Sequence, residues 1–379
     1  MGQLYYHWYI KTSDTKLLFK SFSFYEALLE RKYFDILFED AVLSGTQIDY
    51  GERLAQKFRF YARFVVVCLC TRNLSFCLKL TKEMEGDLKL NMSEFKGKEL
   101  LVTWERFLSA TRVFLEEETS IKFQPDLQQP YSFRLKLKTS KHNDARPYLQ
   151  EAILVSNSDR QVKVSSDLTL DLYRMLQSCE RDEDSRQPAN FPLKNPHKYL
   201  LCNPTFDVFF LFLASSYKAM EIAKSEGNVA NAILLIYISS LVFTVASPSR
   251  PAQILICGKN TQTGPHTAIQ QDDIRPYTRK PLALIVDSPG AFSVFNGFKS
   301  CFGQPLLVIM APETQSDMGY GKGSQLTYFL YAPIHAFCIL CSVTSVSSAA
   351  WKQGEHILTE INLHAEMLLR KEGDPQFGT

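Results

Sequence analysis

The spacing of apolar residues in the first third of the chain predicts helices. Between residues 1 and 125, apolar side chains recur every three or four positions, which places them on one face of an α-helix. The clearest stretches are residues 53–70, 79–90 and 94–117. Short polar breaks separate them, so we expect a region of helices paired as hairpins. We find no internal repeat of about 34 or 40 residues, which argues against a named helical repeat.

The pattern changes between residues 126 and 194. Residues 131–138 alternate apolar and polar side chains, as a half-buried strand does, and residues 152–155 and 162–164 are two further short apolar runs. Asp167 can cap a helix that runs for about 13 residues. The rest of the segment is charged and contains Pro, which indicates a surface linker.

From residue 195 to residue 379 the pattern becomes that of an α/β protein. Four apolar runs are rich in β-branched residues: 233–238, 253–257, 282–286 and 306–310. Such runs suit strands buried on both faces of a parallel sheet. Residues 204–224 predict a helix, and residues 290–298 leave room for a short crossover helix. The sequence therefore predicts a mixed α+β and α/β fold, with an N-terminal helical hairpin region followed by a Rossmann-like α/β domain and a mostly parallel sheet.

Composition narrows the functional class. Hydrophobic residues make up 45% of the chain and aromatic residues 12%, enough for a sizeable core. The net charge is +2, from 42 basic and 40 acidic residues, so no direct binding to nucleic acid is predicted. Most of the nine cysteines lie among apolar residues, which indicates reduced thiols in a nuclear or cytosolic protein.

Two uncharged stretches leave a membrane alternative open. Residues 229–246 and 326–343 contain no Asp, Glu, Lys or Arg, and each is long enough to cross a bilayer. Polar residues interrupt both stretches, which favours buried strands and helices. A membrane-associated protein with one or two spans remains the alternative.

Motifs for catalysis, metal binding or cofactor binding are missing. The chain has neither a Ser-His-Asp set nor an H-E-x-x-H motif. Cys338 and Cys341 form a C-x-x-C pair between apolar flanks, which favours core positions over a zinc or redox site. We therefore predict no enzyme activity, catalytic residue, cofactor or metal ligand.

Asp287 gives the one enzymatic alternative. It follows a predicted buried strand, and α/β proteins bind ligands at the carboxyl ends of such strands. No second acidic residue lies close to it in the sequence. An Asp that caps the next helix is the simpler interpretation, and a cryptic nucleotide-binding domain is the alternative.

A basic and aromatic segment is the candidate partner surface. Arg275 lies just before Pro276, and Tyr277, Arg279 and Lys280 lie between Pro276 and Pro281, just before a predicted strand. Arg and Tyr are common at protein interfaces. We interpret the segment as a loop and predict that these four residues bind a protein partner.

Several segments, in order along the chain, resemble the SCAI family (suppressor of cancer cell invasion). They are residues 2–7, 23–25, 59–64, 67–69, 168–177, 195–206, 276–281, 285–288 and 302–306. The resemblance implies a nuclear regulator, with the cytoplasm as a second compartment, that restrains myocardin-related transcription cofactors acting with serum response factor. A second implied role is as a scaffold in chromatin at DNA double-strand breaks. The family's pattern has no catalytic residues, which agrees with the motif search.

Overall fold

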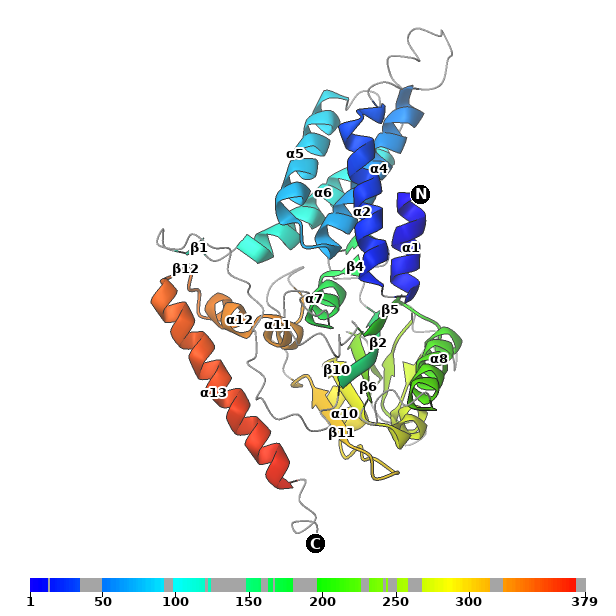
Figure 1. The fold of residues 1–379 in the computed structure, drawn as a ribbon, viewed down its shortest axis with the longest axis vertical. Coiled ribbons are helices and arrows are strands. Elements are labelled where there is room, and N and C mark those ends of the chain that lie inside the picture. The colour runs from blue at the N-terminus through cyan, green and yellow to red at the C-terminus, as the bar shows by residue number, and fades with distance from the viewer. Residues whose placement is uncertain are drawn as a thin grey trace.

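The structure is a computed structural model in which a helical region lies against an α/β sheet (Figure 1). The residues that it describes are 1–12, 14–34, 50–91, 98–119, 122–123, 148–157, 163–165, 168–179, 196–225, 232–240, 243–244, 251–257, 268–313 and 323–372.

Five helices form the described part of the N-terminal region, as the apolar spacing predicts. They are α1 (Gly2–Thr12), α2 (Thr15–Glu30), α4 (Tyr50–Cys70), α5 (Leu74–Leu90) and α6 (Lys98–Thr119). Aromatic rings fill the space between α2, α4 and α5, where Phe64 lies 5.4 Å from Tyr25 and 5.2 Å from Phe76, measured between ring centroids. Helix α5 begins five residues before the predicted stretch because the side chain of Asn73 accepts a hydrogen bond from the backbone N–H of Phe76 and caps it.

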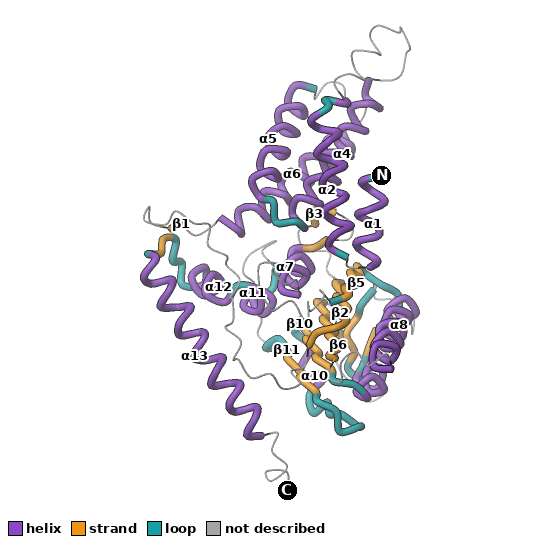
Figure 2. The backbone as a smooth tube through the Cα atoms, viewed as in Figure 1, coloured by secondary structure: helices purple, strands orange, loops and turns teal. Residues whose placement is uncertain are grey.

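The centre of the molecule is a five-stranded parallel sheet in the order β11-β10-β6-β2-β5 (Figure 2). The strands are β2 (Tyr148–Asn157), β5 (His197–Cys202), β6 (Ala232–Ser240), β10 (Leu282–Asp287) and β11 (Leu306–Met310). The predicted combination of a helical region with a mostly parallel sheet is confirmed.

Strand β2 lies inside this sheet, between β5 and β6. The sequence predicts only a short strand of the middle segment at residues 152–155. They are instead the buried centre of a ten-residue strand, because helices cover both faces of the sheet. The predicted boundary between residues 194 and 195 therefore falls between strands of one sheet.

The sheet separates two hydrophobic cores. Leu154 and Tyr237 face the core that they share with the N-terminal helices and with α7 (Leu170–Cys179). Ile153 and Ile236, one position earlier in each strand, face the second core, under α8 (Phe206–Ser225). Alternate residues of a strand point to opposite faces, so the continuous apolar runs reflect burial on both sides.

The apolar run at residues 253–257 is not part of the parallel sheet, so that prediction is wrong. Residues Gln253–Leu255 form β8, between β7 (Phe243–Thr244) and β9 (Ala268–Ile269) in a small antiparallel sheet. Ile254 and Ile256 pack into the core under α8. An apolar run indicates that a strand is buried but does not identify its neighbour.

Of three predictions in the middle segment, only one falls on residues that the structure describes. Residues 162–164 overlap β3 (Lys163–Ser165), which pairs antiparallel with β4 (Leu168–Thr169). The predicted strand at residues 131–138 and the predicted cap Asp167 lie outside the described residues.

The C-terminal part consists mainly of helices. They are α11 (Gln325–Tyr331), α12 (Pro333–Leu340) and α13 (Ser348–Glu372), and β12 (Ser345–Val346) pairs with β1 (Lys122–Phe123). The uncharged stretch 326–343 is thus two short helices separated at Pro333, because Pro cannot continue the preceding helix. Among the residues that the structure describes, no helix is both long enough and apolar enough to cross a membrane.

The Cys338-x-x-Cys341 pair is only half buried. Cys338 lies in the interior beside Trp351, whereas Cys341 is exposed at the C-terminal cap of α12. The prediction that both cysteines are core residues is therefore wrong for Cys341.

Candidate functional site

Asp287 ends strand β10 and is buried, with 2% of its surface exposed. One carboxylate oxygen, Oδ1, accepts a hydrogen bond of 2.6 Å from the hydroxyl of Ser324. The other, Oδ2, accepts a bond from the hydroxyl of Thr327 and a longer bond, 3.4 Å, from the hydroxyl of Tyr237. Two of these donors belong to α11 or its N-terminal cap, so Asp287 ties α11 to the carboxyl edge of the sheet.

The prediction that Asp287 caps the next helix is wrong. That helix, α10 (Ala291–Phe295), has Gly290 at its N-terminal cap. The Ser and Thr hydroxyls that bond to Asp287 are 37 and 40 residues further along the chain, and the Tyr237 hydroxyl is 50 residues earlier. No local pattern marks them, because Ser and Thr are common residues without a distinctive spacing.

A second acidic residue lies beside this site, although none is near Asp287 in the sequence. The backbone N–H of Ser324 lies 3.1 and 3.2 Å from the two carboxylate oxygens of Asp171 in α7. Arg174, one turn along α7, lies 3.4 Å from Asp171 Oδ1 and stacks over the ring of Tyr328 at 4.1 Å. The hydroxyl of Tyr328 is in turn 2.7 Å from Nδ1 of His335.

These groups form one buried polar cluster that joins α7, the sheet, α11 and α12. Its members are Asp171, Arg174, Tyr237, Asp287, Ser324, Thr327, Tyr328 and His335. Burial, together with the charge of Arg174, lowers the pKa of His335 from 6.5 to about 4. Burial raises the pKa of Tyr237 well above its usual value, with Asp287 and Asp171 adding to the effect.

The chemistry of this cluster is that of internal hydrogen bonding. Both carboxylate oxygens of Asp287 already accept hydroxyl donors of the chain itself. A nucleotide or a metal ion at Asp287 would have to compete with these hydroxyl donors. Within the described ranges, no three His, Cys, Asp or Glu side chains come together as a metal site would require.

The predicted partner segment is a 3₁₀ helix, η2 (Arg275–Arg279), and not a loop. Tyr277 is half-buried against α8, with its ring centroid 5.9 Å from that of Tyr217. Lys280 is only 8% exposed, and its ammonium group lies 2.9 Å from Glu221 of α8. These two residues therefore hold η2 on α8.

The two arginines of η2 face solvent. Arg275 pairs with the exposed Asp272 at 3.3 Å, and the guanidinium of Arg279 lies 4.8 Å from the ring centroid of Phe302. Phe302 is itself 44% exposed. The structure thus brings Arg279 and Phe302 together on the surface. Tyr277 and Lys280 instead pack against α8.

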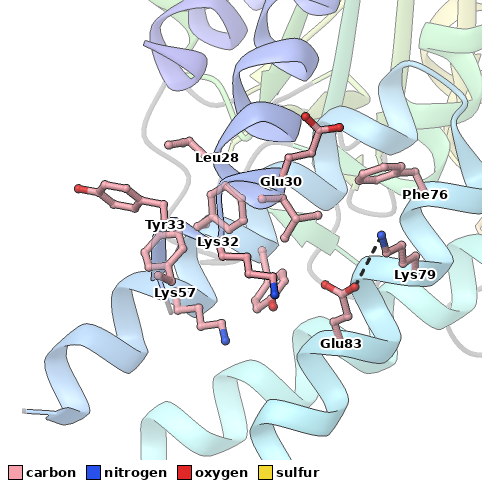
Figure 3. Close-up of a pocket in the computed structure, with 12 residues that line it drawn as sticks. Leu28, Glu30, Lys32, Tyr33, Lys57, Phe76, Lys79 and Glu83 are labelled. Carbon is pink, nitrogen blue, oxygen red and sulfur yellow. Dashed lines mark ion pairs between the residues drawn. The ribbon is translucent and has the colours of Figure 1, made fainter. Parts of the chain in front are cut away.

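A pocket of about 410 Å³ lies between α2, α4 and α5 in the helical region (Figure 3). Phe60, Tyr61 and Phe76 contribute apolar surface to its wall. Lys57 and Lys79 lie at 2.8 Å from Asp87 and 4.0 Å from Glu83, respectively. Neighbouring carboxylates therefore balance these two lysines, and the pocket has no strong charge preference.

Comparison with known proteins gives one consistent match. A family model described as Protein SCAI matches residues 1–253 and 242–377. The mouse and human proteins named Protein SCAI are each 29% identical to this chain over 414 aligned residues, which cover 97% of this chain and 64% of the relative. The Protein SCAI homolog of Dictyostelium discoideum is 26% identical over 334 residues, 64% of this chain and 41% of the relative.

The chain thus spans 64% of the length of its mouse and human relatives. No solved structure matches it.

Proposed function

The chain belongs to the SCAI family, and on that premise we propose that it is a nuclear regulator that acts by binding other proteins. Its partners are myocardin-related transcription cofactors, whose action with serum response factor it restrains. The cytoplasm is its second compartment. The observation that carries this proposal is the family match, which covers nearly the whole chain.

The hydrogen bonding of Asp287 supports a binding role over a nucleotide-dependent one. In α/β proteins, polar groups at the carboxyl edge of the sheet are commonly directed at a ligand. Here Ser324 and Thr327 occupy the carboxylate oxygens and fasten α11 in place. A buried carboxylate that accepts hydrogen bonds from the chain itself is satisfied without a ligand.

The partner surface that we propose includes Arg275 and Arg279 of η2. Both are exposed, and Arg279 is held over Phe302, so its guanidinium is oriented before binding. Arg is enriched at interfaces because its planar group makes several hydrogen bonds and stacks on rings. Tyr277 and Lys280, which pack on α8, support this surface from behind.

A reporter experiment tests the proposed function. The full chain is expressed in cells that carry a serum-response reporter driven by a myocardin-related cofactor, and we expect it to lower the reporter signal. The double variant Arg275→Glu/Arg279→Glu should lose most of this effect at equal protein level. Lys352→Glu, an exposed charge reversal in α13, is the matched control and should act like the wild type.

Two results would contradict the proposal. One is a reporter signal that the nuclear, folded chain leaves unchanged. The other is recovery of the chain only with chromatin at DNA breaks, without any effect on the reporter. The second result would favour the repair scaffold over the transcriptional role.

A further inference from the structure

Helices α1 and α2 carry large apolar side chains on their outer surface. Trp8 is 53% exposed, Leu4 52% and Phe24 42%. Tyr5 is partly exposed between them. We call Leu4, Tyr5, Trp8 and Phe24, with the neighbouring Lys20, the aromatic face.

The rings of the aromatic face contact one another in a defined arrangement. Tyr5 stacks on Phe24 with 5.5 Å between ring centroids, and it meets Trp8 edge-on at 5.9 Å. The ammonium group of Lys20 lies 5.7 Å from the Tyr5 ring centroid. Side chains already held by their neighbours lose less conformational entropy when a partner binds.

Contacts on the inner side of α1 and α2 hold the two helices together, and the aromatic face takes no part in them. The hydroxyl of Ser21 donates to the backbone carbonyl of Gly2 at 2.8 Å, and that of Tyr25 donates to the side chain of Gln3 at 2.9 Å. Tyr9 and Leu18 are buried in the core below. The aromatic face is therefore additional apolar surface on an element that is already anchored.

The size and composition of the aromatic face are those of an interaction site. Each aromatic side chain has roughly 150–250 Å² of surface to bury, so the two half-exposed rings of Trp8 and Phe24, with the partly exposed Tyr5 and Leu4, present on the order of a few hundred Å². A contiguous apolar patch of that size is comparable to the largest one on a typical monomer, which often has a function. Trp and Tyr are also the side chains that most often dominate binding energy at protein interfaces.

Two exposed lysines lie beside the aromatic face. Lys16, Lys20 and Phe24 follow one another at four-residue spacing on α2, so they lie on one face of the helix. Lys16 and Lys20 are both exposed, and α1 contains no acidic residue. The carboxylate of Asp14 accepts the backbone N–H of Lys16 as the cap of α2. A partner that covers the rings would therefore meet positive charge at their edge.

We propose that the aromatic face binds an acidic amphipathic segment of a partner protein. Apolar side chains of that segment cover Trp8, Tyr5 and Phe24, and its carboxylates pair with Lys16 and Lys20. The inference rests on the proposed function in one respect, that the chain acts by binding proteins. It adds a second contact surface, separate from Arg275 and Arg279, and the chemistry of the segment that fits it.

A peptide titration with the full chain tests this inference. The probe is a labelled synthetic peptide of about 20 residues, with Leu and Phe on one helical face and Asp and Glu on the other. Its control replaces every Asp and Glu by Lys. Fluorescence polarisation should show saturable binding of the acidic peptide that weakens as salt rises, and no binding of the basic peptide.

Variants of the full chain locate the contact. Trp8→Ala/Phe24→Ala should weaken acidic-peptide binding at least about 10-fold, and Lys20→Glu about 3-fold or more. The matched control is Phe19→Ala, because Phe19 is 50% exposed on α2 but is not part of the aromatic face. It should leave affinity within about 2-fold. Equal circular dichroism spectra and unfolding midpoints show that each variant is folded.

Three outcomes would overturn the inference: equal binding of the basic peptide, no binding of either peptide, or an equal loss with Phe19→Ala. A fourth is a dimer in light scattering that Trp8→Ala/Phe24→Ala dissociates, since a second copy would then be the occupant.

The reporter experiment distinguishes the two proposals. If the reporter is restrained but the peptide does not bind, the aromatic face is refuted and the proposed function stands. If the peptide binds but the reporter is unaffected, the aromatic face stands as a binding surface and the proposed function is refuted.

Discussion

Gly323 lies where the chain enters α11, directly against the carboxylate of Asp171. Its φ angle is +77°, and a Cβ atom at this position would lie 2.3 Å from Oδ1 of Asp171 and 2.7 Å from Nη1 of Arg174. Only a glycine can adopt this backbone angle and still admit the two side chains so closely. The buried polar cluster therefore depends on a residue that has no side chain.

Replacement of this glycine should destabilise the whole chain. We expect Gly323→Ala to lower the free energy of unfolding by roughly 2–4 kcal/mol, through backbone strain and the clash with Asp171. Gly303→Ala is the matched control: Gly303 has φ +66°, but no atom lies within 4 Å of its added Cβ. It should cost only about 1 kcal/mol of strain. Urea denaturation measures both, and equal losses would refute the clash.

His335 makes stability depend on pH. Its pKa is about 4 in the folded chain, against an ordinary value of 6.5, because burial and Arg174 disfavour the charged ring. Between these values the unfolded chain binds a proton that the folded chain does not, so a falling pH favours unfolding. The expected contribution of His335 is a loss of about 2 kcal/mol between pH 7 and pH 5.

The variant His335→Gln isolates this effect. Its amide can still meet the Tyr328 hydroxyl, which lies 2.7 Å from the His335 ring nitrogen, but it does not titrate. Urea unfolding at the two pH values should show a smaller pH dependence in the variant than in the wild type. The same pH dependence in both proteins would show that the folded ring titrates as it does in the unfolded chain.

At the scale of elements, η2 and α8 are joined by an ion pair between the buried Lys280 and the half-exposed Glu221, and by the edge-to-face contact of Tyr277 with Tyr217. Lys280 lies 2.9 Å from Glu221, and its ammonium group is 5.5 Å from the Tyr217 ring centroid. Burial raises the pKa of Tyr277, as expected for a phenol packed on α8. Half of the segment predicted to bind a partner thus stabilises the protein itself.

Charge reversal should destabilise the protein at Lys280 much more than at Arg275. Lys280→Glu would place a second carboxylate beside Glu221 in a buried position, and we expect it to cost roughly 2–3 kcal/mol of unfolding free energy. Arg275→Glu disrupts only an exposed pair and should cost less than about 1 kcal/mol. Thermal or urea unfolding measures both variants. A Lys280→Glu protein as stable as Arg275→Glu would contradict the structural role of Lys280.

The sequence predicts where strands form better than it predicts which strands pair with one another. The apolar runs at residues 233–238, 282–286 and 306–310 are strands of the parallel sheet, because continuous apolar character reports burial on both faces. The run at 253–257 has the same character but pairs antiparallel elsewhere. Burial is visible in a single strand, whereas pairing depends on the rest of the chain.

The candidate sites show the same limit. Asp287 was singled out by its place after a buried strand, but its partners come from α11 and its acidic neighbour Asp171 from α7. The basic character of residues 275–280 was visible in the sequence, whereas the burial of Lys280 depends on Glu221 and Tyr217 of α8. Contacts between distant segments leave no local pattern in either case.

At the scale of the molecule, one core links the helical region to the sheet. Phe58 and Phe64 of α4 belong to the same hydrophobic cluster as Tyr173 of α7 and Leu154 of β2. Strand β2 in turn joins β5 to β6. The α/β part therefore depends on residues that precede position 195.

A fragment that begins at the predicted boundary should not fold. Residues 195–379 lack β2, so β5 and β6 lose the strand between them and the sheet gains exposed edges. We expect no cooperative urea transition by circular dichroism from this fragment, in contrast to the intact chain. A cooperative transition in the fragment would show that residues 195–379 form an independent domain.

The most direct test of the proposed function is a calorimetric titration of the purified full chain with a purified myocardin-related transcription cofactor. The proposal predicts saturable binding that Arg275→Glu/Arg279→Glu weakens at least about 10-fold, while Lys352→Glu leaves it unchanged. The chain must first show a cooperative unfolding transition, so that failure to bind cannot be due to failure to fold. A folded chain that does not bind the cofactor would contradict the proposal that it restrains transcription by direct contact.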